Sequence, residues 1–235
     1  MRVLRSLLFS VWLYLSMPVA AVGLSPALLM PHRYAMGVIR IWARMVLFGL
    51  RWIVGVRVEC RGLEHRPAGA ALVAGKHQSM LDIVVPFAVL DDPCFVMKKE
   101  LMPLPFFGWF AWKTGMIPVD RAAHAKALKD MLGHARERLR HGRQVVIFPE
   151  GTRTAPGAAP DYKPGVAAIY RDLDAPCFPV ATNSGQCWPA HGMTGFRPGV
   201  VVFEFLEPIP AGLKRADFMR TLEERLETAS TALLT

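Results

Sequence analysis

The feature that most constrains this chain is a stretch near its N-terminus, residues 6–31, without a charged side chain. A run of this length can cross the hydrocarbon core of a bilayer, which takes about 20 apolar residues. Pro18, Gly23 and Pro26 interrupt it, so we do not expect one straight, uniform helix. The rival interpretation is a cleaved signal peptide, but the run exceeds the usual apolar core of about 7–15 residues.

The next segment, residues 34–56, differs in kind because its charges form a stripe. Arg33, Arg40, Arg44 and Arg51 are spaced 7, 4 and 7 residues apart, which places them within about 20° of one line on a helix. The other positions are mostly apolar and include two tryptophans. This pattern favours a helix lying in the plane of an anionic membrane surface. The alternative is a core helix with one solvated face.

Basic flanks usually stay on the cytoplasmic side of a membrane. Residues 6–31 therefore either dip into the bilayer and return at Pro18, or span it once with the N-terminus outside. Both arrangements predict a membrane-associated protein whose larger part faces the cytoplasm, at an inner membrane.

The net charge of +9 and the sequence pI near 9.8 would ordinarily suggest a nucleic-acid partner. Seven of the 28 basic residues, all arginines, lie in residues 1–57, where there is no acid. The remaining 21 basic residues face 19 acidic ones. The excess charge thus belongs to the membrane-directed segment, and we expect no nucleic-acid partner.

Beyond residue 57, short β-rich runs alternate with helical ones, a pattern typical of an α/β sandwich in a single domain. We therefore divide the chain into a membrane-embedding helical segment, residues 1–57, and an α/β domain, residues 58–235. The expected strands are residues 56–61, 70–74, 95–98, 116–119, 144–148, 177–181 and 200–206. The expected helices are residues 81–90, 122–141, 165–172 and 215–233, the last serving packing alone.

The four cysteines, Cys60, Cys94, Cys177 and Cys187, show neither a C-x-x-C pair nor zinc-ligand spacing. A disulfide scaffold is not typical of a domain this large. We read them as reduced thiols, which agrees with a cytoplasmic location, and expect no metal site.

A candidate catalytic pair follows the apolar strand that ends near Gly75. A histidine titrates close to neutral pH and can act as a general base. His77 and Asp82 lie five residues apart, so they cannot share one face of a helix. They can meet if His77 lies in the loop and Asp82 in the first helical turn. The alternative is that Asp82 merely caps its helix, because Ser79 precedes it with capping-box spacing.

A second candidate segment, Phe-Pro-Glu-Gly-Thr-Arg at residues 148–153, also follows an apolar strand. Glycine lets a backbone approach a ligand, and arginine can hold a phosphate with two hydrogen bonds. Arg121, at the end of another apolar strand, is a further candidate phosphate ligand. A structural turn remains the alternative for residues 148–153.

Taken together, these segments resemble the glycerolipid acyltransferases typified by 1-acylglycerol-3-phosphate acyltransferase. The resemblance covers residues 62–181, where four blocks follow the family's order. These are His-x4-Asp at His77 and Asp82, Lys…Pro-x-x-Gly…Ile-x-Val-Asp-Arg ending at Arg121, Phe-Pro-Glu-Gly-Thr-Arg ending at Arg153, and Pro179-Val180. It extends to Lys163-x-Gly165, and it departs from the family where Lys76 replaces a common Asn and where Pro118 interrupts the Ile-x-Val run.

The resemblance implies an enzyme that acylates the sn-2 hydroxyl of lysophosphatidic acid from acyl-CoA or acyl-carrier protein, without a tightly bound cofactor. His77 would deprotonate the hydroxyl and Asp82 would orient His77. The implied substrate-binding residues are Lys98 or Lys99, Arg121 and Arg153 for the phosphate, Glu150, Gly151 and Thr152 near the glycerol, and Pro179 at the donor or acyl site.

Three other functions stay open on the sequence alone. The acceptor can be another lysophospholipid or a lyso-aminolipid. His77 and Asp82 can instead activate water in a thioesterase or lipid hydrolase. The third possibility is a non-catalytic module that binds membranes or polyanions.

Overall fold

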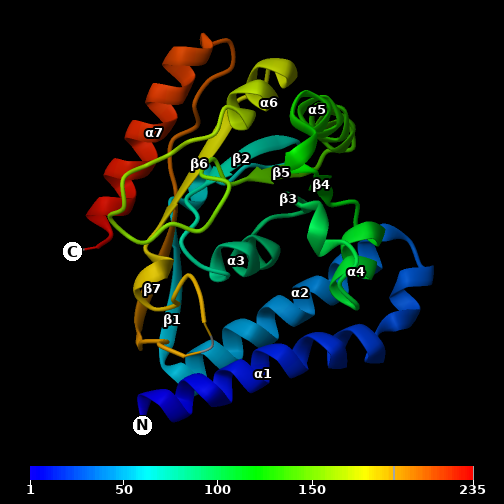
Figure 1. The fold of residues 1–235 in the computed structure, drawn as a ribbon, viewed down its shortest axis with the longest axis vertical. Helices are drawn as coiled ribbons and strands as arrows, with labels where there is room; N and C mark the ends of the chain where they lie inside the picture. Colours follow the sequence, from blue (N-terminus) through cyan, green and yellow to red (C-terminus); the bar gives the residue numbers. More distant parts are fainter. Residues whose placement is uncertain (193, 235) are drawn as a thin grey trace.

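The computed structural model describes residues 1–192 and 194–234, apart from the side chain of His124. A helical hairpin at the N-terminus is followed by a seven-stranded sheet with helices on both faces (Figure 1). This confirms the predicted α/β class.

The sheet has the strand order β1-β7-β6-β2-β5-β3-β4. All neighbouring strands are parallel except β6 and β7. Every residue of β2 and β5 is buried, as expected of parallel strands covered on both faces. The strands are β1 (Val56–Arg61), β2 (Ala71–Gly75), β3 (Pro93–Lys98), β4 (Ile117–Val119), β5 (Gln144–Ile147), β6 (Cys177–Thr182) and β7 (Gly199–Phe205).

One face of the sheet carries α3 (Leu81–Val89), with the hairpin beneath it. The other face carries α5 (His124–Arg140), α6 (Gly165–Leu173) and α7 (Arg215–Ala232), as Figure 1 shows. These helices confirm the expected ones to within a few residues. A short helix, α4 (Phe107–Lys113), was not predicted from the sequence.

The hairpin consists of α1 (Arg2–Gly23), a 3-10 turn (Ser25–Leu29) and α2 (His32–Gly49), which ends in a π turn (Leu50–Val54). Of the two arrangements that the sequence left open, the return at Pro18 is wrong, because α1 continues through Pro18 and turns only after Gly23. One proline removes a single helical hydrogen bond, whereas packing along α2 stabilises the rest of the helix. The interruption predicted at Gly23 and Pro26 is confirmed.

The hairpin packs tightly on itself and on the sheet domain. The Trp12 indole donates a hydrogen bond to the carbonyl of Met45 at 2.8 Å. A Cβ atom on Gly49 would lie 2.3 Å from Trp12, so only glycine fits there. Phe9 is fully buried and packs edge-on against Trp188, with 5.3 Å between ring centroids. The buried face of the hairpin therefore belongs to the same core as the sheet.

The opposite face of α1 is apolar and exposed. Among the described residues, α1 is the helix whose length and composition would allow it to cross a membrane. Its side chains that are more than half exposed include Leu4, Leu8, Val11 and Leu15. On α2 and the following turn, Arg33, Arg44 and Arg51 are exposed and Arg40 is half-buried.

Candidate active site

The predicted pair meets at the carboxyl end of β2, a central strand of the sheet. His77 lies in the loop that follows β2, and Asp82 lies in the first turn of α3. His77 Nδ1 is 3.1 Å from Asp82 Oδ2, and the two side chains are 12% and 2% exposed. This is the geometry expected of a base and its orienting carboxylate.

The Asp82 carboxylate receives three further hydrogen bonds. The backbone amides of Gln78 and Ser79 donate to Oδ2 at 2.6 and 2.8 Å, and the Ser184 hydroxyl donates to Oδ1 at 2.5 Å. A carboxylate that receives three such donors acts as the hydrogen-bond acceptor toward its neighbours. His77 Nδ1 therefore donates to it, which leaves Nε2 as a proton acceptor. The hydrogen bond from the Ser79 amide agrees with the capping interpretation of Asp82, and the contact with His77 agrees with the orienting one. The orienting role of Asp82 in catalysis stays a prediction.

Ser184 is a member of this site that the sequence did not identify. It follows β6, is fully buried, and accepts a hydrogen bond from the Ser79 hydroxyl at 2.9 Å. No recognisable motif surrounds it. Its contact with Asp82 joins residues 102 positions apart, so no local pattern could have predicted it.

Residues 148–154 enclose His77 from a second direction. The Phe148 ring stacks on the imidazole, with 4.0 Å between centroids and 15° between planes. Glu150 is 3% exposed and engages Lys76 Nζ at 2.6 Å, the backbone amide of His77 at 2.8 Å and the Thr154 hydroxyl. Its carboxylate thus supports the loop that carries His77, and its role as a glycerol ligand stays a prediction.

Gly151 occupies a left-handed backbone conformation, with φ of 68°, that strongly favours glycine. Its carbonyl accepts a hydrogen bond from Arg121 at 2.6 Å. Arg121 and the side chain of Lys163 both lie within 4 Å of the position that a Cβ atom on Gly151 would take. The structure therefore brings two basic side chains to this turn, and the Lys163 ammonium pairs with Asp161.

The other predicted phosphate ligands, like Arg121 itself, lie at or near the surface. Lys99 is exposed and pairs with Asp120, beside Arg121, at 3.4 Å. Arg153 is half-buried and Lys98 is exposed, and neither forms an ion pair with any residue that the structure describes. Thr152 is exposed in the same turn as Gly151. The roles of these residues stay predictions.

Pro179 lies in β6, where it is buried and paired in register with Ala74 of β2. The described contacts place it in the sheet rather than on His77. The expected role of Pro179 in shaping the acyl site stays a prediction.

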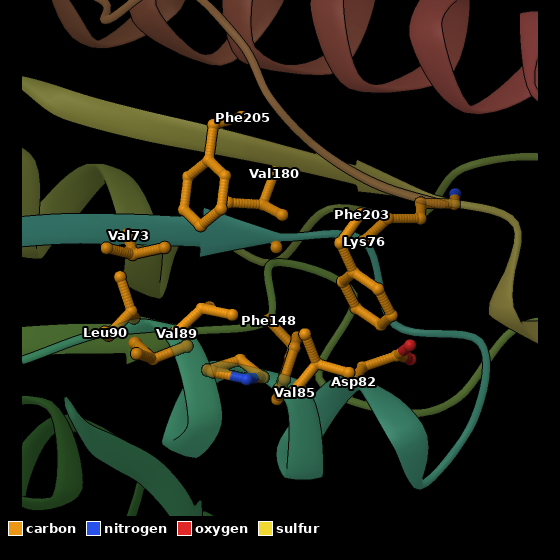
Figure 2. A pocket seen from close by; sticks show the side chains of 13 residues that line it. Val73, Lys76, Asp82, Val85, Val89, Leu90, Phe148, Val180, Phe203 and Phe205 are labelled. Atoms are coloured by element: carbon orange, nitrogen blue, oxygen red, sulfur yellow. The ribbon is translucent and has the colours of Figure 1, made fainter. Parts of the chain in front are cut away.

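A narrow apolar crevice lies between α3 and the sheet and reaches Asp82 (Figure 2). Its volume of about 20 Å³ is room for roughly one water molecule. Hydrocarbon would enter it only after side chains or α3 moved. Its lining includes Val85, Val89, Leu90, Phe148, Val180 and Phe205.

The cysteines do not compete with His77 for a catalytic role. All four are unpaired. Burial raises the pKa of Cys94 to about 11 and raises that of Cys177 further, so both remain protonated thiols at neutral pH. Among the described residues, no group of three or more His, Cys, Asp or Glu side chains is arranged to hold a metal ion.

Known proteins share both the sequence pattern and the fold. The model of the family described as Acyltransferase matches residues 57–183. The 1-acyl-sn-glycerol-3-phosphate acyltransferase of Pseudomonas aeruginosa is 34% identical over 178 residues, 76% of this chain and 68% of that protein. The Escherichia coli protein of the same name is 29% identical over 184 residues, 75% of this chain and 72% of the relative.

The solved structure of the 1-acyl-sn-glycerophosphate (LPA) acyltransferase from Thermotoga maritima has the same fold. Its TM-score is 0.83 at 24% identity, and the match covers 100% of this chain and 98% of that one. The fold and the His–Asp pair, in a chain that the family model matches over more than half its length, define an acyltransferase. More particularly, the chain belongs to the family of the 1-acyl-sn-glycerol-3-phosphate acyltransferases and is an O-acyltransferase.

Proposed function

We propose that this enzyme transfers an acyl chain from an acyl thioester to the sn-2 hydroxyl of lysophosphatidic acid, producing phosphatidic acid. The observation that carries the proposal is the His77–Asp82 pair, in which Nδ1 is held by a carboxylate and Nε2 is left to accept a proton. The names of the relatives support the choice of acceptor.

The reaction needs one general base and no enzyme nucleophile. His77 Nε2 takes the proton of the glycerol hydroxyl while its oxygen bonds to the thioester carbonyl carbon. The tetrahedral intermediate then collapses, the carbon–sulfur bond breaks, and the imidazolium returns its proton to the departing thiolate. Asp82 stabilises the imidazolium in between, and a positioned base of this kind typically contributes about 10²–10⁴-fold to the rate.

The cations beside Gly151 support a phosphate-bearing acceptor. Arg121 donates one hydrogen bond to the Gly151 carbonyl. Its guanidinium has five N–H donors in all, so other donors remain for a phosphate. The side chain of Lys163 lies beside the same turn, with its Nζ paired to Asp161, and Arg153 lies two residues after Gly151. We propose that these three residues, with Lys98 or Lys99, hold the phosphate of the acceptor.

A membrane surface is the expected location because both substrates carry acyl chains. The exposed apolar face of α1 and the exposed arginines of α2 match the chemistry of an anionic interface. We propose that this hairpin holds the enzyme at the cytoplasmic face of an inner membrane.

A substrate screen with product identification tests the proposal. The full chain, purified in detergent, is given labelled acyl-CoA or acyl-carrier protein together with lysophosphatidic acid, another lysophospholipid or a lyso-aminolipid. We expect labelled phosphatidic acid from one or both donors. Arg121→Gln should raise KM for lysophosphatidic acid about tenfold or more, because a charge-assisted phosphate contact is lost. Lys113→Gln, on α4, is the matched control.

Two other outcomes would contradict the proposal, one for the type of reaction and one for the acceptor. Release of free fatty acid without acylated lipid would identify a hydrolase. Acylation of a phosphate-free acceptor in preference to lysophosphatidic acid would overturn the assignment of the acceptor.

A further inference from the structure

A buried ion cluster lies directly beside the catalytic loop and is not part of the proposed chemistry. Lys76 follows β2, and its side chain is 2% exposed. Its Nζ atom is 2.6 Å from Glu150 Oε1 and 2.6 Å from Glu227 Oε1. The Tyr162 hydroxyl donates to the same oxygen of Glu227 at 2.8 Å. One lysine therefore bridges two carboxylates from distant parts of the chain.

The cluster connects the catalytic loop with the C-terminal helix. Glu227 lies on α7, outside residues 57–183 that the family model matches. Figure 2 shows Lys76 and Asp82 on opposite sides of the end of β2, so the lysine reaches the helical layer away from α3. The helix expected to serve packing alone thus also contributes a charged contact to this loop.

The same cluster holds the backbone of His77. Glu150 Oε2 accepts a hydrogen bond from the His77 amide at 2.8 Å, and the Thr154 amide donates to the His77 carbonyl at 2.8 Å. Both backbone groups of His77 are therefore held by residues 150–154. Glu150 thus holds the backbone from which the imidazole projects, and Glu150 is held in turn by Lys76.

Charge explains why a lysine suits this position. Glu150 is 3% exposed, and a buried carboxylate is unfavourable unless it is paired. Burial lowers the pKa of Lys76, but the hydrogen bonds and charges of Glu150 and Glu227 outweigh the effect of burial. The pKa of Lys76 is therefore raised above its ordinary value, and the side chain stays a charged ammonium. Glu227 is 25% exposed and keeps some contact with water.

We propose that Lys76 and Glu227 are positioning residues for His77. The ion bridge from α7 fixes Glu150, and Glu150 fixes the backbone of His77 so that Nε2 faces the acceptor hydroxyl. Neither residue touches the reacting atoms. The inference rests on the proposed function, because it assumes that His77 is the base.

Three variants of the full-length enzyme in detergent separate this role from general stabilisation. Lys76→Met removes the bridge, and Glu227→Gln keeps the shape of the partner but removes its charge. Glu224→Gln changes an exposed glutamate one turn earlier on α7 and is the matched control. The measured quantities are kcat, KM for both substrates, and the imidazole NMR signal of His77 in protein labelled at histidine.

We expect Lys76→Met to lower kcat about 10- to 100-fold, because misplacing a reacting group by about 1 Å can cost 10²-fold. Glu227→Gln should lower kcat about 5-fold. KM should stay within about twofold for both, since substrate contacts are unchanged. The His77 signal should shift in both variants and not in Glu224→Gln. The double variant should be no slower than Lys76→Met alone, because the two residues act through one bridge.

A raised KM with unchanged kcat would overturn the proposal, as would additive effects of the two substitutions. If Lys76→Met does not fold, Glu227→Gln decides: normal kcat together with an unshifted His77 signal would refute the positioning role. If the wild-type enzyme forms no phosphatidic acid, the proposed function fails instead. The NMR comparison then still reports whether the bridge orients His77.

Discussion

At the scale of single residues, Asp82 is the most heavily constrained side chain of the site. It accepts hydrogen bonds from two backbone amides, from Ser184 and from His77. The two amides belong to the loop that also carries His77, so the carboxylate fixes both the loop and the ring. Ser184, a serine without a nucleophile motif, completes this set from the turn that follows β6.

Replacing Ser184 with alanine separates a supporting role from a nucleophilic one. We expect Ser184→Ala to lower kcat about tenfold, because Asp82 keeps its other three partners. If Ser184 were the nucleophile, the variant enzyme would instead lose all activity. The unfolding free energy should fall by about 1–3 kcal/mol, the usual cost of an unsatisfied buried polar group. Steady-state kinetics and denaturant unfolding measure both, and complete loss of turnover in folded protein would contradict this role.

At the scale of elements, the strands and the His77–Asp82 loop were predictable because their signals are local. Apolar β-rich runs mark β2 and β5, and a five-residue spacing allows the pair to meet at one strand end. The return at Pro18, one of two arrangements that the sequence allowed, is wrong, since the continuation of α1 depends on packing against α2. The contacts of Ser184 and Glu227 depend on the fold itself, spanning 102 and 151 positions.

Asp92 connects elements from three parts of the chain. It contacts His32 at the start of α2 at 3.0 Å and Arg143 before β5 at 3.1 Å, and it directly precedes β3. Burial raises its pKa, but the His32 hydrogen bond and the charges of Arg143 and Arg40 outweigh burial, so the pKa lies below 3.8. Its ionised form therefore stabilises the folded state above that pH.

This contribution should disappear as the pH falls through the lowered pKa of the folded state. At pH 6 the wild type should be more stable than Asp92→Asn by on the order of 1 kcal/mol, and the difference should shrink toward pH 3. Asp91→Asn, at an exposed neighbour, is the control. Unfolding measured at several pH values checks this, and a pH-independent difference would count against the ion cluster.

At the scale of the whole molecule, the N-terminal hairpin has two different faces. Phe9, Leu13, Met36 and Leu50 are part of the sheet's core, whereas the leucines on the other side of α1 are exposed. Deleting residues 1–57 would therefore uncover the core and also remove the first residues of β1. The division into segment and domain at residue 57 stays a prediction.

Substituting the exposed face alone isolates membrane binding. Replacing Leu4, Leu8, Val11 and Leu15 with glutamine should move the protein from the carbonate-washed membrane pellet to the soluble fraction. The thermal midpoint should change by only a few degrees, because these side chains are more than half exposed. Leu13→Gln, at a 5% exposed core position, should instead destabilise the fold. A variant that stays in the pellet would contradict membrane binding through this face.

The central claim is that His77 removes the proton from the acceptor hydroxyl, and one measurement tests it most directly. Full-length wild type and His77→Gln are mixed with labelled acyl thioester and lysophosphatidic acid, and single-turnover formation of phosphatidic acid is followed. The account predicts a loss of about 10²–10⁴-fold, with the fold and acceptor binding retained. Wild-type rates of phosphatidic acid formation by folded His77→Gln would contradict it.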